Sequence, residues 1–142
     1  MKQFILFLVF FPSLILAQSI GVDSSCLCGR IELPKTKEGY FVVEDAPSYP
    51  GGSAAFKSLL INNCKFDSGD NGKIFVSFFV SCRGNTCGFK VTKKEGEISK
   101  SSENELINEL GKMEKWIPAK NRGEVVDVQF QKIIELTNGK VK

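Results

Sequence analysis

Residues 73–82, KIFVSFFVSC, constrain the fold more than any other stretch of the chain. The residues of one parity are all apolar, which is typical of a strand that buries one face in a core; they are Ile74, Val76, Phe78 and Val80. The other parity alternates phenylalanine with serine, so that face can be covered by a helix or by a partner. The turn sequence RGNT and a second alternating segment follow, and this order predicts an antiparallel hairpin.

Cys82 and Cys87 flank the turn of this hairpin. If the two cysteines face each other, Val80 lies opposite Phe89, and a single register then aligns the sulfur atoms and the core side chains. We therefore predict a disulfide between Cys82 and Cys87.

Residues 1–17 have the features of a secretory signal peptide. Lys2 precedes an apolar stretch of about 14 residues, shorter than the roughly 20 that a membrane-spanning helix needs, and Ala17 is a small residue suited to cleavage. We expect cleavage after Ala17 and a periplasmic or secreted protein, with no membrane insertion after cleavage. The alternative is an uncleaved inner-membrane anchor through residues 4–17.

Export changes the interpretation of the other cysteines, because disulfides persist in an oxidising compartment. We expect Cys64 to pair with Cys26 or Cys28, and the odd total of five cysteines leaves one thiol free or available to another chain. Metal binding is the alternative, but the C-x-C and C-x4-C spacings without histidine match no common zinc site. We therefore expect no metal-ligand set.

The charge balance and the missing histidine disfavour several functions. The net charge of +3 comes from 19 basic and 16 acidic residues without a dense run of either sign, so a nucleic-acid partner is not expected. The chain has no histidine, the residue most used for proton transfer near neutral pH, and no G-x-S-x-G nucleophile motif. We expect no catalytic residue, no cofactor and no enzymatic activity.

Patterns on both sides of the hairpin predict further elements. Residues 39–44 have the composition of a short strand, and residues 45–52 (DAPSYPGG) form a rigid elbow. Ser53 can cap a first helix that ends at residues 62–63.

After the hairpin, Ser102 and Glu105 have the spacing of a capping box, which predicts the start of a second helix. Residues 116–118 (WIP) stop this helix, and residues 124–136 alternate as one long closing strand.

This order of elements predicts a small two-layer α+β domain. Its three-stranded antiparallel sheet, which a short N-terminal strand can extend, carries two helices on one face. The predicted organisation is a signal peptide at 1–17, a flexible lead-in at 18–38 and the folded domain at 39–138.

Three segments resemble the C-terminal domain of TonB proteins, the energy transducers of Gram-negative envelopes. Residues 47–52 (PSYPGG) match a P-x-[FY]-P-G-G motif of one form of that family. Residues 72–91 resemble its strand, glycine turn and strand, and residues 116–133 resemble its W-x-P segment, short glycine loop and final strand. The resemblance covers residues 40–136, and it implies the same two-layer fold that the order of elements predicts.

The resemblance implies a non-enzymatic interaction domain linked to energy-coupled transmembrane transport. Its partner would be an outer-membrane TonB-dependent transporter, or another envelope protein, bound by pairing a sheet edge with an extended segment. In that family the tyrosine–proline region borders the contact and the closing strand offers the edge. Carried over by motif, these residues are Tyr49, Pro50, Val125, Val126, Asp127, Val128, Gln129, Phe130 and Gln131.

Alternatives stay open for the elbow, the assembly state and the function. The elbow can serve only to orient the first helix, and the chain can form a homodimer through an edge strand or a free cysteine. The lead-in reaches at most about 70 Å, so a force-transmitting spacer is not expected. A secreted structural or inhibitor-like domain would reuse the fold without a role in transport, because a fold does not determine a function.

Overall fold

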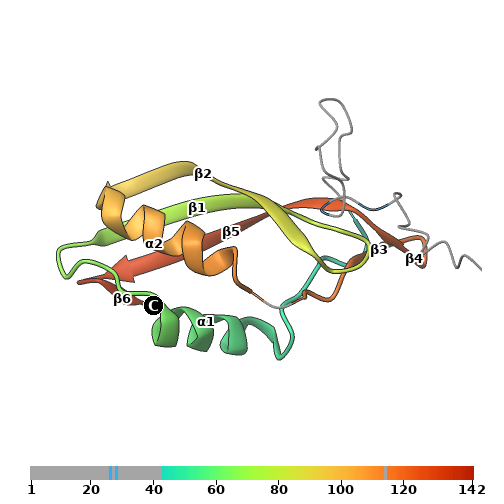
Figure 1. The fold of residues 1–142 in the computed structure, drawn as a ribbon, viewed down its shortest axis with the longest axis horizontal. Coiled ribbons are helices and arrows are strands. Elements are labelled where there is room, and N and C mark those ends of the chain that lie inside the picture. Colours follow the sequence, from blue (N-terminus) through green and yellow to red (C-terminus); the bar gives the residue numbers. More distant parts are fainter. Residues whose placement is uncertain (1–25, 27, 29–42, 114) are drawn as a thin grey trace, which may run out of the picture.

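Two helices lie on one face of a four-stranded antiparallel sheet in the computed structural model of the chain (Figure 1). The structure describes Cys26, Cys28 and residues 43–113 and 115–142. The strand order is β2-β1-β5-β6, and a separate two-stranded ribbon contains β3 and β4. The elements are α1 (Gly52–Asn63), β1 (Asn71–Val80), β2 (Thr86–Glu97), α2 (Lys100–Leu110), β3 (Ala119–Asn121), β4 (Glu124–Val126), β5 (Val128–Thr137) and β6 (Lys140–Val141).

The predicted α+β class is confirmed, but the sheet has four strands in place of three. The added strand is C-terminal: β6 pairs with the end of β5 across a turn at residues 138–139. The sheet therefore extends past residue 138, where we placed the end of the domain. Most of the predicted strand at 39–44 lies outside the described residues, as do the signal peptide, its cleavage site and nearly all of the lead-in.

The face of β1 that alternation assigned to the core is fully buried, and Phe78 is 0 % exposed. From the helices, Phe56 and Leu60 of α1 and Leu106 and Leu110 of α2 are buried in the same core. The apolar face of a strand and the apolar stripes of two helices thus cover each other, which is the arrangement that removes most apolar surface from water.

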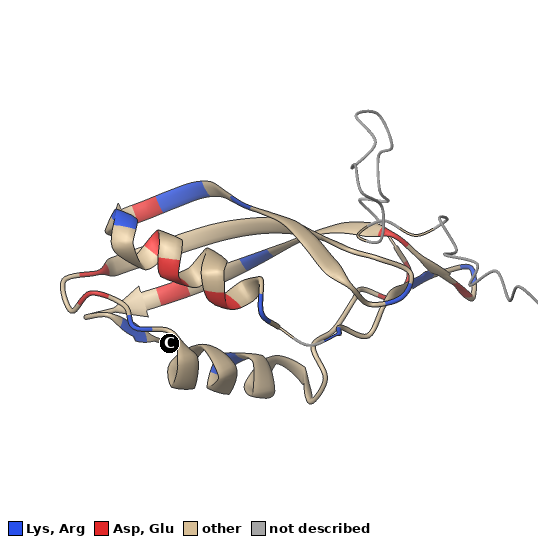
Figure 2. Cartoon of the chain, in the orientation of Figure 1, with Lys and Arg blue, Asp and Glu red and all other residues tan. Residues whose placement is uncertain are grey.

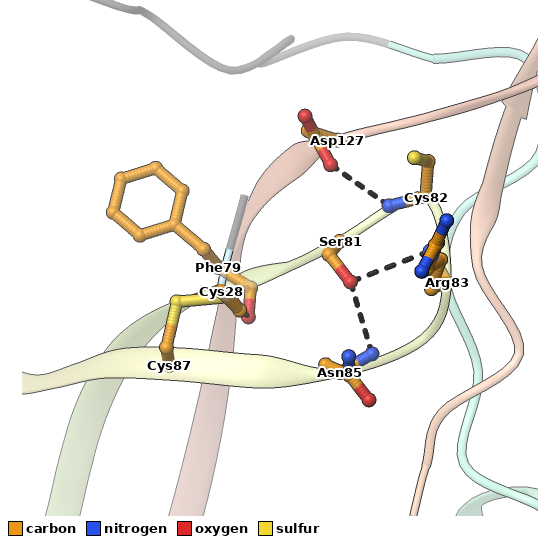
Figure 3. Close-up of a disulfide and its surroundings, with 8 residues drawn as sticks. All are labelled: Cys28, Phe79, Ser81, Cys82, Arg83, Asn85, Cys87 and Asp127. Carbon is orange, nitrogen blue, oxygen red and sulfur yellow. Dashed lines mark hydrogen bonds between the residues drawn. A yellow bond between two sulfur atoms is a disulfide. The ribbon is translucent and has the colours of Figure 1, made fainter. Parts of the chain in front are cut away.

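The register of the β1–β2 hairpin differs from the prediction. Val80 lies opposite Thr86 and not opposite Phe89. The cause is the loop between them, where the Ser81 N–H donates to the Asn85 carbonyl at 2.8 Å. The Ser81 hydroxyl oxygen also accepts from the Asn85 N–H at 3.0 Å (Figure 3). A register shift between Ser77 and Phe79 then restores the parity of the apolar side chains, so Phe89 still reaches the core. A second shift lies further from the turn, between Phe75 and Val76.

The predicted Cys82–Cys87 disulfide is wrong. The bonds are Cys26–Cys82 and Cys28–Cys87, with Cα–Cα distances of 5.6 and 5.4 Å, and Cys64 is a free thiol. Cys82 lies in the hairpin loop, beyond the last residue pair of the two strands. Cys87 of β2 lies opposite Phe79 of β1, so the two cysteines do not face each other.

The two disulfides join one short C-x-C segment to the hairpin loop at Cys82 and to β2 at Cys87. Figure 3 shows Cys28 bonded to Cys87 beside Phe79. The bonds fit an oxidising setting, secreted or periplasmic. No helix in the described ranges is long and apolar enough to cross a membrane.

Both helices begin at residues other than the predicted caps. Gly51 precedes α1 with a φ of 83°, and Ser53 lies inside the helix, because the two glycines of the elbow supply left-handed backbone and start the helix two residues earlier. Ser99, and not Ser102, caps α2 by accepting the Ser102 N–H at 3.1 Å. Ser102 is buried, and its hydroxyl oxygen accepts the Asp67 N–H at 2.9 Å.

The predicted single strand at 124–136 is divided at Asp127. The Asp127 carboxylate accepts the N–H of Cys82 at 2.8 Å, which fixes the chain where it leaves β4 and enters β5 (Figure 3). Before this point β4 pairs with β3, and after it β5 pairs with β1. Alternation of side chains continues through such a break, so the sequence alone did not reveal it.

Candidate functional site

The sheet has two outer sides on which a further strand could add, and the first is the outer edge of β2. The second half of this strand is densely charged, which discourages pairing with another chain; its charged residues are Lys93, Lys94, Glu95 and Glu97. In Figure 2 the charged positions gather on the end of β2 next to α2. Lys94 and Glu103 of α2 form an ion pair at 2.9 Å, so the helix also covers this end.

The second side is the outer edge of β5. One edge of β5 pairs with β1 along its length, from Val128 to Leu136. On the other edge β6 pairs only with Leu136 and Thr137, and the Glu135 carbonyl accepts the Lys142 N–H at 3.0 Å. In the described part of the chain, no strand pairs with residues 128–134 on this side.

The direction of the free backbone groups follows from strand geometry. The N–H and C=O of one residue in an antiparallel strand point to the same side, and neighbouring residues point to opposite sides. Because the Glu135 carbonyl points to β6, the N–H and C=O groups of Gln129, Gln131 and Ile133 point to the free edge. These three residues offer three donors and three acceptors in the arrangement that an added strand requires.

The side chains of these three residues lie on the face of the sheet away from the helices. Ile133 is 56 % exposed, unusual for an isoleucine in the middle of a long strand. Gln131 is exposed, and its side-chain amide donates to the Thr92 hydroxyl at 3.1 Å. Gln129 and Gln131 also line a shallow hollow of about 230 Å³ with Ser77 and Thr92. This surface combines amide groups with an exposed apolar side chain.

Along the helix side of β5 runs a groove of about 200 Å³ between α1 and β5–β6. Lys132 lies in this groove and interrupts the apolar parity of β5. Its ammonium lies 5.3, 6.0 and 5.7 Å from the ring centroids of Phe56, Trp116 and Phe130. A cation over aromatic faces is favourable, and these contacts explain a lysine at an otherwise apolar position.

Tyr49 and Pro50 have different environments. The Tyr49 ring lies at 5.6 Å from Phe56 and 5.7 Å from Trp116, edge to face, so Tyr49 belongs to the aromatic cluster that Lys132 covers. Pro50 is exposed in the turn before α1. The elbow is also tied to the segment before β3, since Ser48 and Ile117 exchange two backbone hydrogen bonds of 3.1 and 2.8 Å. The elbow therefore orients α1 and contributes an aromatic side chain close to β5.

Only part of the predicted strand segment reaches the free edge. Val125 and Val126 belong to β4 and pair with β3, and Asp127 lies at the break. Val128 and Phe130 point to the core, while Gln129 and Gln131 present backbone groups to the edge. Ile133 and Lys132 were missed, although the parity of Gln129 and Gln131, continued by two residues, would have indicated Ile133.

Cys64 is a poor nucleophile in this structure. Burial raises the pKa of its thiol to about 12, and the negative charges of Glu109 and Glu105 add to the shift. The thiol therefore stays protonated at neutral pH, and the protonated form reacts slowly.

Among the described residues, one group of possible metal ligands lies close together: Cys26, Cys82 and Asp127, with ligand atoms within 4.8 Å of one another. The two sulfur atoms are bonded to each other, so they are not thiolate ligands.

Comparison of the chain with protein-family models, curated proteins and solved structures found no match. The resemblance to the TonB C-terminal domain therefore stays a prediction, and the candidate site rests on the geometry of the β5 edge.

Proposed function

We propose that the protein is an exported, non-enzymatic interaction domain of the Gram-negative envelope. It captures an extended segment of an outer-membrane transporter, or of another envelope protein, as an added strand on the free edge of β5. The observation that carries this proposal is the row of outward-pointing backbone groups at Gln129, Gln131 and Ile133 of β5. The opposite edge of the same strand is paired with β1 along its length. The TonB-like sequence features support the link to energy-coupled transport.

The expected affinity follows from the number of backbone groups. Six new hydrogen bonds at about 1 kcal/mol each would contribute on the order of 6 kcal/mol, before the cost of association is subtracted. Strand addition on this edge alone is therefore weak, and side-chain contacts must supply the selectivity. A weak, reversible contact suits a protein that engages and releases its partner.

Titration of the exported, disulfide-bonded protein with N-terminal peptides of outer-membrane receptors from the same organism tests this function. Backbone amide NMR shifts should move at β5 and at the elbow. Gln129→Pro should weaken binding because proline removes the N–H that faces the partner. Gln129→Ala is the matched control, since it keeps the N–H and should retain most of the affinity.

A negative result has a defined meaning. If no peptide binds at millimolar concentration, or if the shifts avoid β5, the structural or inhibitor-like role replaces this proposal. The export step has its own test, because the intact mass of the protein from the envelope should lack residues 1–17.

A further inference from the structure

Three lysines line the groove between α1 and β5; one of them, Lys142, is paired with Glu135, and the other two have no such partner among the described residues. Lys57 comes from α1 and Lys132 from β5, and both line the same groove with Phe56 and Ile133. The backbone of Ile133 points to the free edge, as shown above. An added strand would therefore place alternate side chains over this groove, which both lysines line.

Within the described residues, neither lysine has a carboxylate partner. The Lys132 ammonium lies 5.3 to 6.0 Å from three aromatic ring centroids, and the ion pairs at the protein surface involve other lysines. Glu135 is the acidic side chain of the groove, and it is paired with Lys142 at 3.2 Å. The groove thus keeps an excess of positive charge beside an unpaired strand edge.

We infer that the strand captured by β5 carries a glutamate or aspartate on the side that faces α1, and that Lys57 and Lys132 bind this carboxylate. This inference rests on the proposed strand capture and adds the chemistry that selects the partner. A strand with a lysine or arginine at that position would instead meet two like charges. Complementary charge gives selectivity and faster association, whereas the main-chain bonds are the same for every sequence.

The position of Lys132 makes it suited to this role. Lys132 is half-buried, and the rings of Phe56, Trp116 and Phe130 limit the positions of its ammonium. An ammonium that is already positioned loses less conformational entropy when it binds a carboxylate than a free lysine does. Lys57 is exposed on α1 and can approach the same carboxylate from the other wall of the groove.

The test compares two capped peptides that alternate valine and threonine and differ in one central residue, glutamate or glutamine. Trp116, the single tryptophan of the chain, lies 6.0 Å from the Lys132 ammonium, so its fluorescence reports binding. At low ionic strength the glutamate peptide should bind about fivefold more tightly than the glutamine peptide. This ratio should approach one at about 1 M salt, where charges are screened within about 3 Å.

Variants assign the effect to the two lysines. Lys132→Gln and Lys57→Gln should each reduce the preference for glutamate, and the double variant should abolish it. Lys90→Gln on β2 is the control and should leave the preference unchanged. Lys57 is exposed, so its variant keeps the test valid even if Lys132→Gln disturbs the core.

Two results would overturn the inference, and they differ in what they leave standing. Equal affinity for the two peptides, with NMR shifts at β5 for both, removes the acidic preference but keeps strand capture. Absence of binding by either peptide at the β5 edge removes the acidic preference together with the capture on which it depends.

Discussion

Replacing Phe78 by alanine should remove a large part of the stability of the domain. Phe78 is 0 % exposed and lies at the centre of the aromatic cluster, with ring centroids 5.1, 5.2 and 5.9 Å from Phe89, Trp116 and Phe130. Truncation of a buried phenylalanine costs about 3–5 kcal/mol through lost transfer energy and a residual cavity. Because three ring contacts, each worth about 0.5–1.5 kcal/mol, are lost together, we expect a loss at the upper end of this range, about 5 kcal/mol.

The adjacent parity of the same strand provides the control. Phe75 is half-buried on the face away from the helices, where the Lys93 ammonium lies 5.4 Å from its ring. Phe75→Ala leaves a surface that water can fill, so it should cost only about 1–2 kcal/mol. Phe78→Leu retains most of the volume and should cost less than Phe78→Ala.

The assay is urea denaturation of the oxidised protein, followed by the fluorescence of Trp116, which is 3 % exposed in the folded state. A shift of the midpoint without a change in slope reports the free energy of unfolding. If Phe75→Ala and Phe78→Ala lowered it equally, the assignment of the two faces of β1 would be refuted.

Three further predictions follow from the turns and the cysteines. Gly84→Ala should be strongly destabilising, because a Cβ there would overlap the Trp116 carbonyl. Gly123 has a similar positive φ but lies in open space, so Gly123→Ala should cost only about 1 kcal/mol. Equal denaturation midpoints for the two variants would contradict this prediction. Because the pKa of Cys64 is raised to about 12, stability should fall as pH rises above about 9, where the unfolded thiol ionises first, and Cys64→Ser should remove this part of the pH dependence. In the chain-entropy treatment, the loss of either disulfide alone should cost about 2.5 kcal/mol, since the other disulfide keeps the long loop closed. The loss of both, whose separations are 56 and 59 residues, should cost about 7 kcal/mol. Additive losses in paired Cys→Ser variants would contradict this shared-loop geometry.

The sequence by itself determined the parts of the fold that depend on local periodicity. The alternation in β1 identified the buried face, since a strand must place every second side chain on one side. The cap and stop residues predicted both helices, although not the first residue of each. These features follow from neighbours within a few positions of each other.

Tertiary structure decided the features that depend on distant partners. The loop geometry at Ser81 fixed the register of β2, and the bond from the Cys82 N–H to Asp127 divided the closing strand. The disulfides depended on where the C-x-C segment docks, so a register argument confined to the hairpin paired the wrong cysteines. The candidate edge likewise exists because β6 ends after pairing with two residues of β5, and no local pattern in residues 128–134 encodes the length of a later strand.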